Sequence, residues 1–134
     1  MILVDSSVWI DFFNGRMSRE TDLMALLLRR RILLTGDLIL AEVLQGFRQD
    51  RHMGRARRAL LSLPYADMVG QEVALASAQN YRLLRGRGVT VRKTIDVVIA
   101  TFCIEMATSC CTPIATLRPW RNTSGYGRRE HYPA

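Results

Sequence analysis

The chain has 134 residues, which is enough for a single domain with its own hydrophobic core. Apolar residues make up 49% of the sequence and charged residues 23%, which excludes a disordered chain. No apolar run approaches the roughly 20 residues of a membrane span. The formal charge of +7 favours a polyanionic partner, and nucleic acid is the most common one.

The N-terminal residues and the cysteines indicate the compartment. No basic segment precedes the first apolar run, and Asp5 follows too early for a signal peptide, so we expect a cytoplasmic protein without a membrane segment. The three cysteines form no Cys-x-x-Cys pair, so we expect reduced thiols. A zinc site is not expected, because His52 and His131 lack the spacing of zinc ligands.

The first half of the chain predicts strands that alternate with helices. Residues 2–4 and 31–35 are short apolar runs and predict two buried strands. The predicted helices cover residues 8–13, a segment that opens at residues 18–21, and residues 38–47. Ser6 and Ser7 are the expected caps of the first helix, and Gly36 and Asp37 of the third.

The second half predicts three more helices. Residues 50–62 form a very basic segment that Pro64 ends, with arginines at positions 51, 55, 57 and 58. Residues 70–84 predict a long helix that stops at residues 86–88. A last helix begins at Thr94, and we expect it to be central because it is apolar on almost every side.

This order of elements predicts the fold class and the domain boundary. The strand runs lack period-two alternation, which favours an α/β fold whose small parallel sheet is covered on both faces. The character of the sequence changes near Met106, and residues 108–134 show little periodicity and contain no acid before Glu130. We therefore divide the chain into a domain at residues 1–106 and an atypical tail at residues 107–134.

Three carboxylates lie in unusual surroundings. Asp5 ends a predicted strand, and open α/β sheets bind ligands beyond the carboxyl ends of their strands. Glu42 and Asp96 each lie within a mostly apolar helical segment. A carboxylate in such surroundings is costly to ionise unless a partner stabilises its charge.

Two explanations fit these acids, and spacing alone does not decide between them. In the first, Asp96 caps its helix and Glu42 pairs with a buried arginine. In the second, all three acids share one divalent cation, because carboxylate oxygens suit Mg²⁺ or Mn²⁺. Such an ion would activate water and neutralise charge on a phosphodiester.

Three segments together resemble the motifs of VapC-type toxins of the PIN-domain family. They are residues 2–12 (ILVDSSVWIDF), residues 40–47 (LAEVLQGF) and residues 81–100 (YRLLRGRGVTVRKTIDVVIA). Their order and spacing also agree with that family, and the resemblance covers about residues 1–105. It implies a PIN-like three-layer α/β/α fold and a metal-dependent ribonuclease, the toxin of a type II toxin–antitoxin system.

The resemblance also implies roles for individual residues and partners. Asp5, Glu42 and Asp96 would be the catalytic and metal-binding acids, with Mg²⁺ or Mn²⁺ as the cofactor. Ser6 would line the site with Ser7, and Arg92 would approach the RNA backbone. The implied partners are RNA, a cognate VapB-type antitoxin and a second copy of the chain in a homodimer.

The tail departs from the family pattern. Members of the family usually carry a fourth acidic motif after the last long helix, whereas residues 109–117 (SCCTPIATL) contain no acid. We interpret this as a reading-frame change near Met106, because codons allowed by the tail can spell Leu-Leu-His-Thr-Asp-Arg-Asp-Phe in the neighbouring frame. The lost acids would map to residues 113–116. Weaker metal binding and weakened ribonuclease activity are expected.

Other interpretations remain open for the marked residues. Trp9, Phe12 and Phe13 are candidates for core or dimer contacts, and less so for base stacking. The arginines of residues 51–58 form either a solvated face or a surface for RNA or antitoxin. Two other functions are considered: a non-catalytic PIN-fold protein that binds RNA or antitoxin, and a phosphate-transferring enzyme with Asp5 as nucleophile. The last usually has a second Asp where Ser7 stands.

Overall fold

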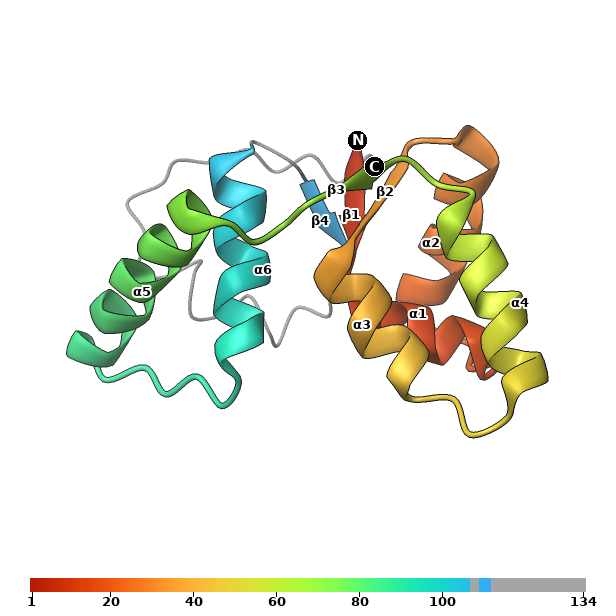
Figure 1. The fold of residues 1–134 in the computed structure, drawn as a ribbon, viewed down its shortest axis with the longest axis horizontal. Helices are drawn as coiled ribbons and strands as arrows, with labels where there is room; N and C mark the ends of the chain where they lie inside the picture. Colours follow the sequence, from red (N-terminus) through yellow and green to blue (C-terminus); the bar gives the residue numbers. More distant parts are fainter. Residues whose placement is uncertain (107–108, 112–134) are drawn as a thin grey trace.

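The computed structural model describes residues 1–106 and 109–111, and Figure 1 shows their arrangement. Within these residues, helices and short strands alternate, as the sequence predicts. The strands are β1 (Ile2–Val4), β2 (Leu33–Gly36), β3 (Tyr65–Ala66) and β4 (Ser109–Cys111). The helices are α1 (Ser6–Phe13), α2 (Arg19–Arg30), α3 (Asp37–Gln45), α4 (Asp50–Leu61), α5 (Gln71–Gly86) and α6 (Thr94–Glu105).

The four strands form one sheet in the order β3-β2-β1-β4. Every pairing is parallel, and the register sets Leu3 beside Leu34 and Cys110. Leu3 and Val4 are fully buried, as are Leu33 and Thr35 of β2. The prediction of a small, buried parallel sheet is therefore confirmed.

The helices form a layer on each side of the sheet. Figure 1 shows α5 and α6 on one side and α1 to α4 on the other. Trp9, Met24 and Ile39 are buried within the larger layer, and Phe102 of α6 joins the same core cluster. The predicted three-layer α/β/α fold is confirmed, and α6 carries the largest run of buried residues, as expected for a central helix.

Two local predictions need correction. The cap of α1 is Asp5, whose carboxylate accepts a hydrogen bond from the backbone N–H of Ser7, whereas Ser6 and Ser7 lie inside the helix. The second strand begins at Leu33 and not at Arg31, because Arg31 closes α2 in the left-handed conformation with φ of 54°. The predicted start of α2 at residues 18–21 is confirmed, and reciprocal hydrogen bonds between Ser18 and Thr21 cap it.

Gly36 joins β2 to α3 where the chain has no room for a side chain. A Cβ at this position would lie 2.4 Å from Cγ of Met68 and 2.9 Å from the carbonyl oxygen of Ala66. Asp37 then accepts hydrogen bonds of 2.9 Å from the backbone N–H groups of Leu38 and Met68. The start of α3 is thus fixed against the segment that follows β3.

Most of the predicted tail lies outside the described residues. Of residues 107–134, the structure describes only the backbone of Ser109–Cys111, which pairs with β1. The positions assigned to the lost acidic motif, residues 113–116, are among those not described, so the reading-frame interpretation stays a prediction. No helix within the described ranges is long and apolar enough to cross a membrane.

Candidate functional site

The three acids singled out from the sequence come from three elements that meet at one edge of the sheet. Asp5 follows the last residue of β1, Glu42 lies in the middle of α3, and Asp96 lies in the first turn of α6. Figure 1 shows that the end of β1, the start of α1 and the start of α6 share the same side of the molecule. This is the side on which open parallel sheets bind ligands.

Asp5 is held in place by its own helix. Its side chain is only 8% exposed, and its Oδ2 atom accepts hydrogen bonds from the backbone N–H of Ser7 at 3.3 Å and from the Ser7 hydroxyl at 2.5 Å. Both donors lie at the N-terminus of α1, where the helix dipole also favours a negative charge. The other carboxylate oxygen, Oδ1, is not used by these two bonds.

Glu42 is tied to the same helix from across the fold. The buried hydroxyl of Ser6 donates a hydrogen bond to Oε2 of Glu42 and so joins α1 to α3. Glu42 has no ion pair with an arginine in the described part of the chain, where the salt bridge found joins Asp11 and Arg16 at 3.6 Å. The buried-pair explanation for Glu42 therefore has no support in these residues.

Asp96 is influenced by the other two acids. Its pKa is raised above the usual value, first by burial, then by the negative charge of Asp5 and, to a smaller extent, of Glu42. Lys93 acts in the opposite direction. The capping position of α6 belongs to Lys93 and makes no side-chain capping bond, so capping does not explain Asp96. Asp96 therefore lies close enough to Asp5 and Glu42 to be repelled by the charge of each.

The acidic corner, as we call Asp5, Glu42 and Asp96, suits a hard cation. Its donors are carboxylate oxygens, which Mg²⁺ and Mn²⁺ prefer, and the negative charges of Asp5 and Glu42 contribute to the raised pKa of Asp96. However, among residues 1–106 no three Asp, Glu, His or Cys side chains lie within direct ligand reach of one point. An ion here would keep several waters, as Mg²⁺ usually does.

Two basic residues precede Asp96 in the segment that leads into α6. Arg92, predicted to approach RNA, is exposed in the segment that leads into α6. Lys93 follows it, and its charge acts on Asp96. Sequence reasoning gave Lys93 no role, although its position three residues before Asp96 was an available signal.

A polar brace that the sequence did not predict orients α6. The side chain of Asn80 in α5 donates a hydrogen bond of 3.0 Å to the hydroxyl of Thr101, which in turn donates to the carbonyl oxygen of Val97 at 2.7 Å. Thr101 is fully buried. The brace fixes α5 against α6 one turn beyond Asp96.

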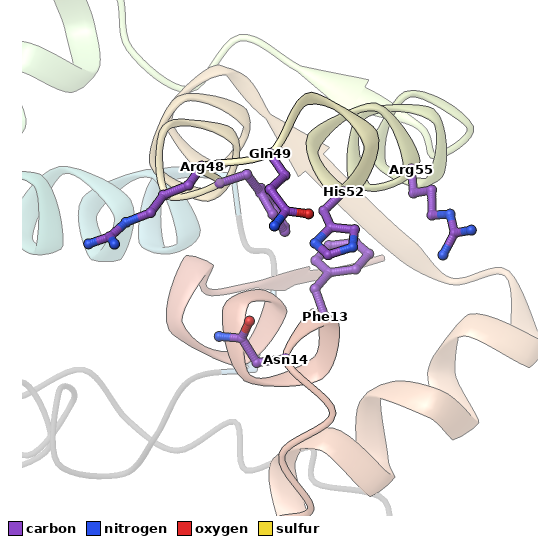
Figure 2. Close-up of a pocket in the computed structure, with 8 residues that line it drawn as sticks. Phe13, Asn14, Arg48, Gln49, His52 and Arg55 are labelled. Carbon is purple, nitrogen blue, oxygen red and sulfur yellow. The ribbon is translucent and has the colours of Figure 1, made fainter.

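A separate hollow lies at the far end of α1 (Figure 2). Its volume is about 380 Å³. Figure 2 shows Arg48 and Arg55 toward opposite sides, with His52 and Phe13 between them. We call it the basic pocket; its lining residues are Phe13, Asn14, Gly46, Phe47, Arg48, Gln49, His52 and Arg55. The sequence drew attention to Arg55, whereas neither Arg48 nor the pocket was predicted.

Comparisons with known proteins agree on the fold. The PIN domain family matches residues 2–112. The structure is similar to the crystal structure of VapBC2 from Rickettsia felis bound to a DNA fragment from their promoter, with 16% sequence identity and a TM-score of 0.66. The similarity covers 82% of this chain and 85% of the other. No curated protein sequence matches this chain.

Proposed function

Since the chain belongs to the PIN-domain family, we propose that it is a VapC-type toxin, a Mg²⁺- or Mn²⁺-dependent ribonuclease that hydrolyses RNA phosphodiesters. The observation that carries the proposal is the acidic corner. Three carboxylates from three elements meet at the carboxyl edge of the sheet, and burial, together with repulsion from Asp5 and Glu42, raises the pKa of Asp96. A divalent cation would relieve that repulsion.

Each residue of the corner has a proposed role. Asp5, Glu42 and Asp96 would hold the ion, directly or through water. When bound, the ion supplies activation of a water molecule and neutralises charge on the phosphodiester. Ser7 orients Asp5, and Ser6 orients Glu42, by the hydrogen bonds that they donate.

Charge around the corner would guide the substrate. Arg92 is exposed next to it, and Lys93 already acts on Asp96. Both cations would attract the phosphate groups of RNA. Ser6 would serve the substrate mainly by positioning Glu42, because its hydroxyl is already engaged.

The proposed partners are a small VapB-type antitoxin and a second copy of the chain. The neighbour from Rickettsia felis is a VapBC2 structure bound to promoter DNA, which supports an antitoxin for this protein too. The proposed homodimer surface lies on α5, where Leu75 is 62% exposed and Leu83 is 47% exposed. These residues are eight apart and so lie on one face of the helix.

A second candidate is a non-catalytic PIN-fold protein that binds RNA or antitoxin. Two observations favour it. The described residues hold no set of three Asp, Glu, His or Cys side chains that could all bind one metal ion directly, and the fourth acidic motif is absent from residues 109–117. We propose that the same loss weakens the ribonuclease activity of this chain.

RNA cleavage with Mg²⁺ or Mn²⁺ tests the proposal. Cleavage by the chain is compared with cleavage by a tail-restored version, whose tail carries the Leu-Leu-His-Thr-Asp-Arg-Asp-Phe motif of the neighbouring reading frame. Each protein is made with and without Asp5→Asn. Asparagine still caps a helix but is a poorer metal ligand, so loss of cleavage would report the metal site. Asp11→Asn is the matched control on the same helix.

Cleavage by the restored chain that Asp5→Asn abolishes and Asp11→Asn preserves would support the ribonuclease. Inert proteins throughout, with both metals and several RNAs, would reject it in favour of the binding protein.

A further inference from the structure

The basic pocket has the chemistry of a site for an anionic, aromatic ligand. Phe13 and Phe47 contribute rings whose centres lie 5.9 Å apart, nearly perpendicular to each other. Arg48, Arg55 and His52 add nitrogen donors, and no acid is found among the described residues that line the hollow. Neither arginine forms an ion pair within the described ranges, so both guanidinium groups can bind a new anion.

The pocket and the acidic corner lie along the same seam between α1 and α3. Ser6, which contacts Glu42, and Phe13, which lines the pocket, are seven residues apart and share one face of α1. Glu42 and Gly46 are four residues apart and share one face of α3. At about 1.5 Å per residue, Ser6 and Phe13 are separated by about 10 Å along α1, so the two sites are close neighbours.

We propose that the basic pocket binds one nucleotide of a single-stranded RNA, beside the nucleotides at the acidic corner. The base would stack on the aromatic side chains around Phe13, and phosphate groups would pair with Arg48 and Arg55. This combination of aromatic stacking and a cationic rim is how proteins bind single strands without sequence preference. A peptide partner fits less well, because an apolar peptide would leave the two guanidinium groups unpaired.

The choice of RNA as the ligand rests on the proposed function, but the test distinguishes a failure of the nucleotide site from a failure of the ribonuclease proposal. Binding of a fluorescently labelled, single-stranded RNA to the full-length chain is measured by anisotropy in EDTA, where no metal-dependent cleavage occurs. Arg55→Gln is compared with Arg57→Gln, an exposed arginine on the same helix that does not line the pocket. The two variants change the net charge equally.

We expect Arg55→Gln to weaken RNA binding about tenfold and to reduce the salt dependence by roughly one phosphate contact. Arg57→Gln should change affinity less than about twofold, because it loses only long-range attraction. Phe13→Leu should weaken binding about tenfold through lost stacking. His52→Ala is a second test, at an exposed side chain whose removal leaves the core intact.

Equal weakening by Arg55→Gln and Arg57→Gln, with no effect of Phe13→Leu or His52→Ala, would overturn the nucleotide site and leave a protein partner as the occupant. If the pocket variants selectively weaken RNA binding in EDTA but no RNA is cleaved in Mn²⁺, the nucleotide site is upheld and the ribonuclease proposal fails.

Discussion

The two ends of the α1–α3 seam carry opposite charge. At one end, Asp5, Glu42 and Asp96 concentrate negative charge, and burial raises the pKa of Asp96. At the other end, Arg48 and Arg55 border a hollow with an aromatic lining. One pair of helices therefore brings an acidic end and a basic end side by side, and the proposed metal-dependent enzyme acting on a polyanion requires both.

The two ends also differ in how firmly they are built. The acidic corner is fixed by hydrogen bonds from Ser6 and Ser7, and Glu42 stands on a helix whose start is locked by Gly36 and Asp37. The basic pocket is lined largely by exposed side chains of α4 and the segment before it. We therefore expect changes at the corner to affect chemistry and changes at the pocket to affect binding.

The largest expected effect is that of Glu42→Gln on turnover. Glutamine keeps an oxygen to accept the Ser6 hydrogen bond but loses the charge that the metal needs. We expect kcat for RNA cleavage by the tail-restored chain to fall at least about 100-fold with little change in KM. Glu72→Gln, an exposed acid at the start of α5, is the control. A tenfold rise in KM with unchanged kcat would show that Glu42 serves binding instead.

Two glycine substitutions compare how tightly the backbone is packed at the start of α3 and in α4. Gly36→Ala would force a Cβ against Met68 and the Ala66 carbonyl, so we expect a loss of about 2 kcal/mol in the free energy of unfolding. Gly54→Ala in α4 meets no atom within 4 Å and should be neutral or stabilising by up to about 1 kcal/mol. Urea denaturation of both variants measures the difference. Equal stabilities would contradict the tight packing found at Gly36.

Arg48→Gln tests the pocket in the catalytic reaction. The loss of a cation at the rim should raise KM about tenfold, equivalent to about 1.4 kcal/mol, and leave kcat unchanged. Steady-state cleavage of a short RNA separates the two constants, with Arg57→Gln as the control. If Arg48→Gln lowered kcat and left KM unchanged, the division of labour between the two ends would be wrong.

The smallest expected effect is that of Asp96→Asn on stability, measured without metal. Because the pKa of Asp96 is raised in the folded state, its charged form disfavours folding at neutral pH. The associated stability is fully present below the ordinary value of 3.8 and is lost as the pH rises through the raised pKa. In EDTA, Asp96→Asn should therefore stabilise the protein by a few tenths of a kcal/mol at pH 7, after allowance for solvent screening.

Thermal unfolding at pH 7 and near pH 3 measures this effect. The gain from Asp96→Asn should disappear at the lower pH. A variant that is less stable than the parent at pH 7 would contradict the repulsion among the acids.

The sequence predicted the fold because its signals are local. Apolar runs predicted β1 and β2, and the capping pattern at Ser18 predicted the start of α2. β3 was missed because two residues carry no periodicity, and β4 was missed because it lies in the segment assigned to the atypical tail. The sequence did not identify the residue that caps α1. The cap was assigned to Ser6 and Ser7 and not to Asp5, because Ser and Asp both favour the N-cap position.

The candidate site was only partly predictable, for a physical reason. The three acids were identified by their apolar neighbours and by resemblance to a family, but their mutual arrangement depends on contacts between distant segments. The Ser6–Glu42 hydrogen bond spans 36 residues, and the Asn80–Thr101 brace spans 21. The basic pocket joins the end of α1 to the start of α4, a meeting that no local pattern encodes.

The central claim is that the acidic corner binds a divalent cation, and a Mn²⁺ titration followed by electron paramagnetic resonance tests it most directly. The chain should show saturable binding of about one Mn²⁺, which Asp5→Asn removes and Asp11→Asn retains. The absence of saturable binding, or equal binding by the chain and Asp5→Asn, would contradict the metal site.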